Sequence, residues 1–350
     1  MRTAITELFG IRYPVLLPGM SHVSMPPLVA AVSEAGGLGI LATGPLSAIQ
    51  TREAIEEIRR RTAKPFGVGI SLMLPGAKEN AEVALAERVP VINYSLGKGD
   101  WITEQAHAQG LKVIATVVNA RHALAAQRYG ADALQVTGHE AAAHGGAVTS
   151  LVLLPSIIEQ VEIPVVAAGG FGSGRGLIAA LALGAAGVAM GSRFAASSES
   201  PIHANTKELI VHKSVEETLY TDKFDGMMCR VMESNAAHRA IAEGSNFLLA
   251  LRNSFDLARR MGLSWFKLAL AVAAKGPDHL LRMTQLVNAS ELTRLAIHEG
   301  DTERGVQLIG QVQGLIHDLP TVAQLMERVM AEAEATRHDL DRDEFSGSIS

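Results

Sequence analysis

The chain has 350 residues, 48% of them hydrophobic and 19% charged, which is the balance of a soluble globular protein with a large core. Its net charge of −5 comes from interspersed acidic and basic residues, and no basic stripe indicates a nucleic-acid partner. The single cysteine, Cys229, excludes an internal disulfide and favours a cytoplasmic protein. Glu7 and Arg12 interrupt the first apolar run, and no stretch reaches about 18 uninterrupted apolar residues, so neither a signal peptide nor a membrane helix is expected.

Short apolar runs alternate with segments of helical spacing through the first 200 residues. The runs are apolar almost throughout, as strands buried on both faces should be. We expect strands within 13–20, 38–44, 65–73, 89–95, 111–118, 131–138, 163–170 and 187–192. The helices expected between them lie within 25–37, 47–61, 77–88, 101–110, 120–129, 151–160 and 174–183, with Ser47 as an N-cap.

Several joints between a helix and the next strand share one phrase: EAGGLGIL, AQGLKVIA, RYGADALQV and LGAAGVAMG. In each, a glycine suits a left-handed helix end, and a buried strand follows at once. Eight such units in succession favour a (β/α)8 TIM barrel over the alternative, an open doubly wound sheet.

After Phe194 the pattern becomes helical, with almost no strand signal. We therefore predict three parts: a barrel over 1–200, an all-helical extension packed on it over 201–340, and a frayed polar tail over 341–350. The extension is also a candidate homodimer interface. Its expected helices are 205–212, 235–242, 247–260, 264–274, 277–286, 291–299, 302–317 and 321–337.

Two adjacent glycine-containing turns predict a phosphate site. Gly169-Gly170 end the seventh expected strand and Gly191-Ser192 end the eighth, which is where barrels commonly bind phosphate. Glycine lets backbone N–H groups approach an anion, and Ser192 adds a hydroxyl. The alternative is that these glycines only serve tight turns. The later GFGSGRG segment resembles a dinucleotide fingerprint, but it lacks the acidic residue expected after it.

His144 is the candidate catalytic residue. It lies in the small-residue loop GHEAAAHGG after the sixth expected strand, where barrel sites form. An imidazole there suits proton transfer or stabilisation of a developing anion. We interpret the neighbouring His139 as structural. The histidines are otherwise scattered, so no metal site is predicted, and the chain has no nucleophile elbow and no Walker lysine.

The ordered motifs YPVLLPGM, EAGGLGIL, KPFGVGI, GHEAAAHGG, IPVVAAGGFGSGRG, ALALGAAGVAMGSRF and ESPIHANTKE resemble the nitronate monooxygenase (2-nitropropane dioxygenase) family. The resemblance covers about residues 1–240, and IHEGDTERGVQLIGQVQGLIHDLP resembles the tail of bacterial members. Related FMN-dependent NADH:quinone reductases and flavin enoyl-thioester reductases share nearly all of these motifs.

The resemblance implies non-covalent FMN at the barrel mouth, with His144 as the catalytic histidine. The FMN phosphate would lie on Gly169, Gly170, Gly191 and Ser192, and the flavin ring near Pro18, Gly19, Met20, Gly69, Thr137 and Ala142. Gly138, Ala189 and Met190, at the ends of expected strands, complete the predicted cofactor site.

The chain departs from the family pattern at three places. Gly69 stands where the family usually has Asn, Thr137 where it often has Gln, Glu or Asp, and Glu140-Ala141-Ala142-Ala143-His144 where it usually has E-A-G-G-H. Ser71, two residues along on the same strand face, is a partial substitute for the missing Asn.

Three functions follow from these observations. The first is oxidation of alkyl nitronates with O2 to a carbonyl compound and nitrite. The second is NAD(P)H-dependent reduction of a quinone or an enoyl thioester with the same flavin. The third is a non-catalytic barrel that binds a flavin or another phosphorylated ligand.

Overall fold

The computed structural model describes residues 1–142, 144–243, 246–260, 262, 264–274 and 276–342. Eight parallel strands close into a barrel in sequence order, since β1 pairs with both β2 and β8. The predicted (β/α)8 TIM barrel is therefore confirmed. The strands are β1 Val15–Leu17, β2 Leu38–Ala42, β3 Phe66–Ser71, β4 Val91–Ser95, β5 Lys112–Val117, β6 Ala133–Thr137, β7 Val165–Ala168 and β8 Gly187–Ala189.

Helices surround the barrel as expected. They are α2 Pro26–Glu34, α3 Ala48–Arg61, α4 Ala77–Ala86, α5 Asp100–His107, α6 Ala120–Arg128, α7 Ser150–Ile158 and α8 Gly174–Ala182. Gly36, Gly110, Gly130 and Gly184 follow four of these helices with φ of 95°, 73°, 85° and 93°, which confirms the left-handed helix ends predicted from the repeated phrase. Ser47 caps α3 through its side chain, also as predicted.

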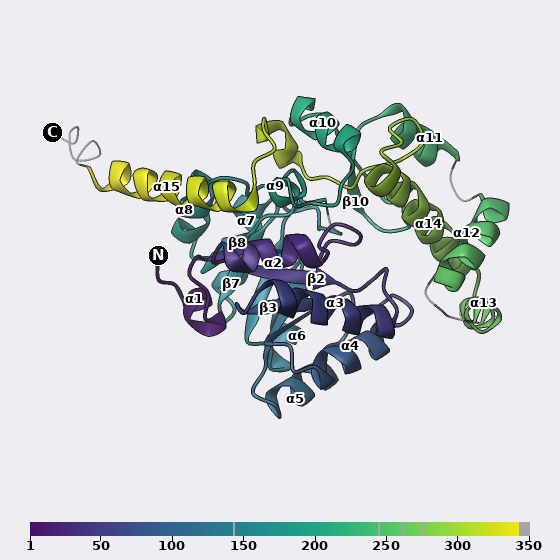
Figure 1. Ribbon diagram of the computed structural model, residues 1–350, viewed down its shortest axis with the longest axis horizontal. Helices are drawn as coiled ribbons and strands as arrows, with labels where there is room; N and C mark the ends of the chain where they lie inside the picture. The colour runs from purple at the N-terminus through teal and green to yellow at the C-terminus, as the bar shows by residue number, and fades with distance from the viewer. Residues whose placement is uncertain (143, 244–245, 261, 263, 275, 343–350) are drawn as a thin grey trace.

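A short helix that the periodicity did not predict, α1 Ala4–Phe9, closes one end of the barrel. Its Ile5 and Phe9 join Leu16, Leu38 and Ile40 in one buried cluster inside the strands. Figure 1 shows α1 on the left and helices of the extension on the right. Side chains of α1 and of the strands thus fill the amino-terminal end of the barrel interior. A ligand site can therefore form only at the carboxyl ends of the strands.

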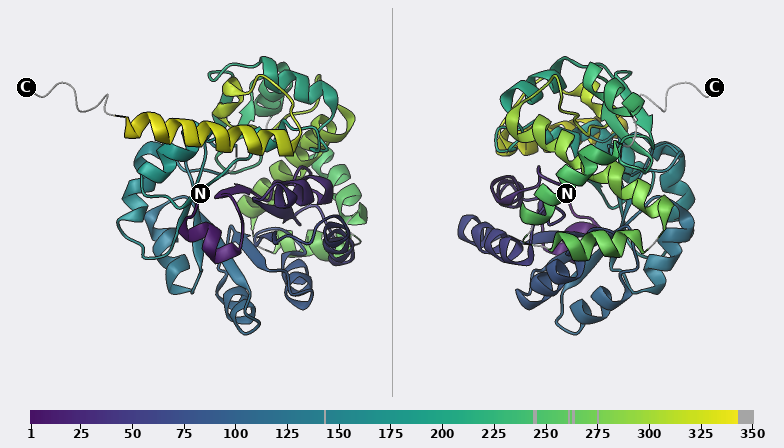
Figure 2. Two further views of the ribbon diagram at one scale, coloured as in Figure 1. Left: turned by 60° about the vertical axis from the view of Figure 1, so that its left-hand side comes forward. Right: turned by 90° about the vertical axis from the view of Figure 1, so that its right-hand side faces the viewer.

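The extension is mainly helical. Its elements are α9 Ser192–Ala195, α10 Ala204–His212, β9 Thr218–Thr221, β10 Cys229–Met232, α11 Asn235–Glu243, α12 Phe247–Arg260, α13 Trp265–Ala273, α14 Pro277–Arg294, a π-helical turn Leu295–Glu299, a 3-10 helix Gln311–Leu315 and α15 Val322–Asp341. The last helix packs across α8 and α2 (Figures 1 and 2). Of the expected frayed tail, residues 343–350 lie outside the described residues.

Two expectations for the extension are wrong. The antiparallel hairpin β9–β10 stands where almost no strand was expected. The continuous helix expected over 302–317 does not form, and only the 3-10 helix Gln311–Leu315 lies within it. Gly305, Gly310 and Gly314 pack where a side chain would strike neighbouring backbone. A Cβ on Gly310 would lie 2.7 Å from the Glu140 carbonyl oxygen, and one on Gly314 would lie 2.3 Å from Val215 N. Tertiary contacts therefore override the helical spacing of this segment.

Candidate functional site

The predicted cofactor residues meet at the carboxyl end of the barrel. Gly19 and Met20 follow β1, Gly69 and Ser71 belong to β3, and Gly138 follows β6. A Cβ built on Gly19 would lie 3.6 Å from the Gly69 Cα, and one on Gly191 would lie 3.3 Å from Met20 Sδ. The closed barrel thus brings together turns that are far apart in the sequence.

The predicted phosphate site has the geometry of an anion cradle. Gly169 and Gly170 both adopt left-handed backbone, with φ of 96° and 85°, and Gly170 is exposed. Gly191 directly precedes α9, whose first residue is Ser192. The Ser192 hydroxyl oxygen accepts a hydrogen bond from the Gly310 N–H at 3.0 Å, so its own hydrogen remains to be donated to an anion.

Polar side chains line the barrel interior just below this opening. Alternation along the strands points Asn93, Thr116, Gln135 and Thr137 inward, above the apolar cluster. Asn93 Nδ2 donates to Thr116 Oγ1 at 3.0 Å. Gln135 Oε1 and Thr137 Oγ1 are buried and have no hydrogen-bond partner among the described residues, which suits a polar ligand above them.

The amide that the family pattern places at Gly69 occurs here on the next strand. Gly69 pairs in register with Asn93, a buried residue that the sequence reasoning missed. Ser71, the predicted substitute, lies two residues along β3 and pairs with Ser95. The ladder register is the observation that identifies Asn93, and no motif in the sequence does so.

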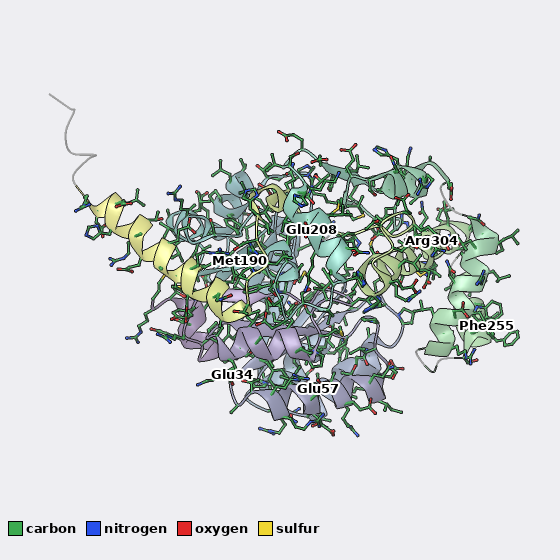
Figure 3. The ribbon with its side chains drawn as sticks, turned by 45° about the horizontal axis from the view of Figure 1, so that its top comes forward. Glu34, Glu57, Met190, Glu208, Phe255 and Arg304 are labelled. Atoms are coloured by element: carbon green, nitrogen blue, oxygen red, sulfur yellow. The ribbon has the colours of Figure 1, made fainter. Side chains whose placement is uncertain are left out.

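Ala189 and Met190 are oriented differently from each other. Ala189 belongs to the cluster inside the barrel, whereas the fully buried Met190 packs in the layer between strands and helices. Met190 is labelled within the body of the molecule in Figure 3. Only backbone atoms of Met190 are therefore positioned for a ligand at the barrel mouth.

The loop between β6 and α7 is held in place by Glu140. Its carboxylate accepts hydrogen bonds from Ser150 N and Ser150 Oγ at the start of α7, at 3.0 and 2.9 Å. A negative group is favourable at a helix N-terminus, so Glu140 both caps α7 and fixes the loop. The Glu140 carbonyl in turn accepts from Gln311 N at 2.9 Å. Ala142 lies in this loop, and Ala143 falls outside the described residues.

His144 is partly exposed, with 29% of its side-chain surface accessible, and its Nε2 lies 2.8 Å from Asp225 Oδ2. Asp225 is buried and comes from the β9–β10 turn, 81 residues away, and the sequence reasoning missed it. His139 packs edge-on against Tyr220 and its Nδ1 lies 3.2 Å from the Gly146 carbonyl oxygen, which fits its structural interpretation. Burial, followed by the nearby Asp225, raises the pKa of the Cys229 thiol, so this cysteine stays protonated and unreactive.

No group of three or more His, Cys, Asp and Glu side chains within the described ranges is arranged to hold a metal ion. Across the same ranges, no helix has both the length and the apolar character needed to cross a membrane. The exposed glycine turns, the unpartnered interior acceptors and the anchored histidine instead fit a phosphorylated cofactor with a ring at the barrel mouth.

Fold and site together define a TIM-barrel protein with His144 at its mouth, beside turns suited to a phosphorylated ligand. The model of the nitronate monooxygenase family matches residues 2–332, and the chain belongs to that family. The protein is accordingly an oxidoreductase, and a purely non-catalytic barrel is set aside.

Three proteins that resemble this chain over nearly its whole length are as follows. A Rhodococcus jostii protein named (3aS,4S,5R,7aS)-5-hydroxy-7a-methyl-1-oxo-octahydro-1H-indene-4-carboxyl-CoA dehydrogenase is 37% identical, over 95% of this chain and 96% of its own. The structure of FabK from Thermotoga maritima is 36% identical, with a TM-score of 0.83 over 97% of this chain and 99% of its own. The structure of nitroalkane oxidase from Streptomyces ansochromogenes is 25% identical, with a TM-score of 0.77 over 97% and 100% of the two chains.

Proposed function

We propose that the protein is an FMN-dependent oxidoreductase that acts on an acyl thioester of coenzyme A. The observation that carries this proposal is the full-length similarity, at 37% identity, to a relative named as a carboxyl-CoA dehydrogenase. The FabK structure, at 36% identity, is similar over the same length. An enoyl thioester is one substrate of the second function expected from the sequence. The relative named as a carboxyl-CoA dehydrogenase favours this substrate class over an alkyl nitronate.

The glycine turns would hold the FMN phosphate. Gly170 and Gly191 offer backbone N–H groups and Ser192 offers its hydroxyl. Thr137 Oγ1 and Gln135 Oε1, both buried without a hydrogen-bond partner among the described residues, would bind polar atoms of the cofactor. When bound, FMN accepts or supplies a hydride, and NAD(P)H or NAD(P)+ is the co-substrate that balances it.

His144 would move the proton that accompanies the hydride. The C–H bond next to a thioester carbonyl is weakly acidic, so a neutral imidazole can remove that proton while a hydride leaves the adjacent carbon. In the reverse direction the imidazolium returns the proton to the same carbon. This role needs an imidazole that is held in place and yet accessible, and His144 has both properties.

The second candidate function is nitronate oxidation. The family description and the nitroalkane oxidase structure favour it. Removal of a proton next to a nitro group is chemically similar to removal of one next to a thioester carbonyl, so His144 serves either reaction. The two functions therefore differ in the substrate that the mouth of the barrel accepts rather than in the catalytic group.

Anaerobic mixing of the flavin-loaded protein distinguishes the candidates. We expect NADH or NADPH to bleach the flavin absorbance, and crotonyl-CoA or cyclohex-1-ene-carboxyl-CoA to restore it. In the reverse reaction, the saturated thioester cyclohexanecarboxyl-CoA should itself reduce the oxidised flavin and bleach its absorbance. Bleaching by propyl-nitronate alone, with no response to nicotinamides or thioesters, would overturn the proposal in favour of the second candidate.

A His144→Gln variant completes the test. It should keep its flavin and its thermal stability, while turnover of the responsive substrate falls by about 10²- to 10⁴-fold. Unchanged turnover would remove His144 from the mechanism. His122→Gln provides the matched control. His122 is exposed on α6, and its backbone N–H, not its ring, donates to the N-cap residue Asn119.

A further inference from the structure

The β9–β10 hairpin forms several hydrogen bonds to the loop that carries His144. Tyr220 Oη donates to the Gly145 carbonyl at 2.9 Å, and the Arg230 guanidinium donates to the His139 carbonyl at 3.0 Å. The Arg230 backbone N–H donates to the Ala142 carbonyl at 3.3 Å. With the contact between Asp225 and His144, the hairpin holds both flanks of the loop as well as its histidine.

Asp225 itself is held rigidly. Its Oδ1 accepts from Met227 N at 3.1 Å, which leaves Oδ2 for His144. The next residue, Gly226, has a φ of 85°, and a Cβ there would lie 3.0 Å from Gln285 Oε1 and 3.2 Å from the Arg282 Cα on α14. The hairpin turn is therefore seated against α14, and only 5% of the Asp225 surface is exposed.

This geometry determines which ring nitrogen of His144 carries the hydrogen. An aspartate carboxylate only accepts hydrogen bonds, so a 2.8 Å contact with Oδ2 requires a hydrogen on Nε2. In a neutral imidazole the other nitrogen, Nδ1, then has the free lone pair. We propose that Asp225 is a positioning residue that fixes this tautomer, so that Nδ1 of His144 is the atom that takes up or returns the substrate proton.

The proposal rests on His144 being the proton-transfer group of the proposed function, but it does not depend on the thioester. It predicts a separable effect of Asp225. In Asp225→Asn the carboxamide offers an oxygen or an NH2 group to Nε2, so it no longer enforces one tautomer. We expect kcat to fall by about ten- to a hundredfold with KM, flavin content and melting temperature little changed.

Asp222→Asn is the matched control. Asp222 lies in the same turn region and is exposed, so its loss should leave kcat unchanged. Asp225→Glu, which keeps the carboxylate, should recover part of the lost kcat.

Nitrogen NMR tests the tautomer without any substrate. Long-range 1H–15N correlation spectra of 15N-histidine protein, recorded at a pH where the spectra themselves show a neutral His144 ring, distinguish the two ring nitrogens. Subtraction of the His144→Gln spectrum assigns the His144 signals. In the wild type we expect a protonated Nε2 and an unprotonated Nδ1, and in Asp225→Asn a mixture.

Two results would overturn the proposal. One is an Asp225→Asn spectrum with the same single tautomer as the wild type. The other is a parallel loss of flavin, melting temperature and kcat, which would assign Asp225 to stability alone. Because the spectra are recorded without substrate, they remain informative even if the thioester test fails.

Discussion

The Gly310 N–H donates to the Ser192 hydroxyl at 3.0 Å and joins the extension directly to the predicted phosphate turn. Both residues are buried, and 118 positions separate them in the chain. The neighbouring Gln311 N–H donates to the Glu140 carbonyl. The same short segment therefore fixes the turn after β8 and the loop after β6, so the extension helps to position the predicted cofactor site.

Ser192→Ala should weaken both stability and cofactor retention. The Gly310 N–H would lose its acceptor in a buried position, which costs about 1–3 kcal/mol in the free energy of unfolding. The anion would also lose a hydroxyl donor. Melting curves and the flavin-to-protein absorbance ratio after gel filtration measure the two effects.

Ser198→Ala is the control for this prediction. Its hydroxyl donates to the Leu319 carbonyl at 3.3 Å in an exposed position, so its removal should change neither quantity appreciably. If Ser192→Ala retained full flavin occupancy, the hydroxyl would have no part in phosphate binding.

Gly170→Ala should reduce flavin occupancy through the backbone. Any residue with a Cβ at a φ of 85° is strained by about 1–2 kcal/mol. Within the protein there is room for the methyl group, because the nearest atom is Glu140 Cβ at 3.5 Å. The new Cβ would instead project where an anion must approach the backbone, so flavin loss should exceed the loss of stability.

Gly110→Ala separates strain from binding. Gly110 has a φ of 73° at the opposite end of the barrel, and no atom lies within 4 Å of a Cβ built there. It should lower the melting temperature as Gly170→Ala does but keep its flavin. Equal flavin content in the two variants would argue against a phosphate at Gly170.

The barrel could be predicted because each of its strands and helices is indicated by residues within its own short segment. The strands are short and almost wholly apolar, and four of the barrel helices are followed by a glycine where left-handed backbone is needed, as Gly36 and Gly184 show. Closure then places Gly170 and Gly191 together without any further assumption. The position of the two glycine turns is predictable for the same reason, while phosphate binding there stays a prediction.

The partners of His144 could not be predicted in this way. Asp225 is 81 residues from His144, and their contact depends on a two-stranded hairpin with strands of four residues each. The Asp225-Gly226 dipeptide is the turn signal that the sequence offers here. Without a clear strand pattern on either side it did not predict the hairpin. Asn93 could not be predicted either, because only strand register identifies it.

Asp318 should make the phosphate-side helix α9 sensitive to acid. A hydrogen bond from Arg328, together with the charge of the buried Arg193 in α9, lowers the pKa of Asp318 below its ordinary value of 3.8. A carboxyl whose pKa is lowered on folding contributes stability above its unfolded pKa and loses it as the pH falls through the folded pKa. That contribution should therefore begin to fall below about pH 4 and be lost as the pH drops through the lowered pKa of Asp318.

Asp318→Asn should be less stable than the wild type at neutral pH by about 1 kcal/mol, a modest figure because Asp318 is nearly half exposed. The difference should shrink as the pH falls, which melting temperatures between about pH 3 and 7 would show. Glu334→Gln removes an exposed pair with Arg337 on α15 and should have little effect at any pH. A constant difference between Asp318→Asn and the wild type would contradict the linkage.

The outer face of α12 and α13 should join two copies of the chain. Nine of the 20 exposed large apolar side chains of the described residues lie between Phe247 and Leu281, and Phe255 lies at the outer edge of the molecule in Figure 3. Seven of the nine belong to α12 and α13 themselves. Monomers rarely expose so many large apolar side chains on neighbouring helices, so we expect a homodimer through this face.

Light scattering coupled to gel filtration measures the mass in solution. Leu248→Lys and Leu270→Lys each place a charge on this face, at side chains that are 79% and 73% exposed, and should shift a dimer to monomer without unfolding it. Leu151→Lys, at a similarly exposed position on α7, should leave the dimer intact. A monomeric wild type would mean that there is no dimer interface. Dissociation by Leu151→Lys alone would place the interface away from α12 and α13, because a contact on those helices makes Leu248 and Leu270 the sensitive positions.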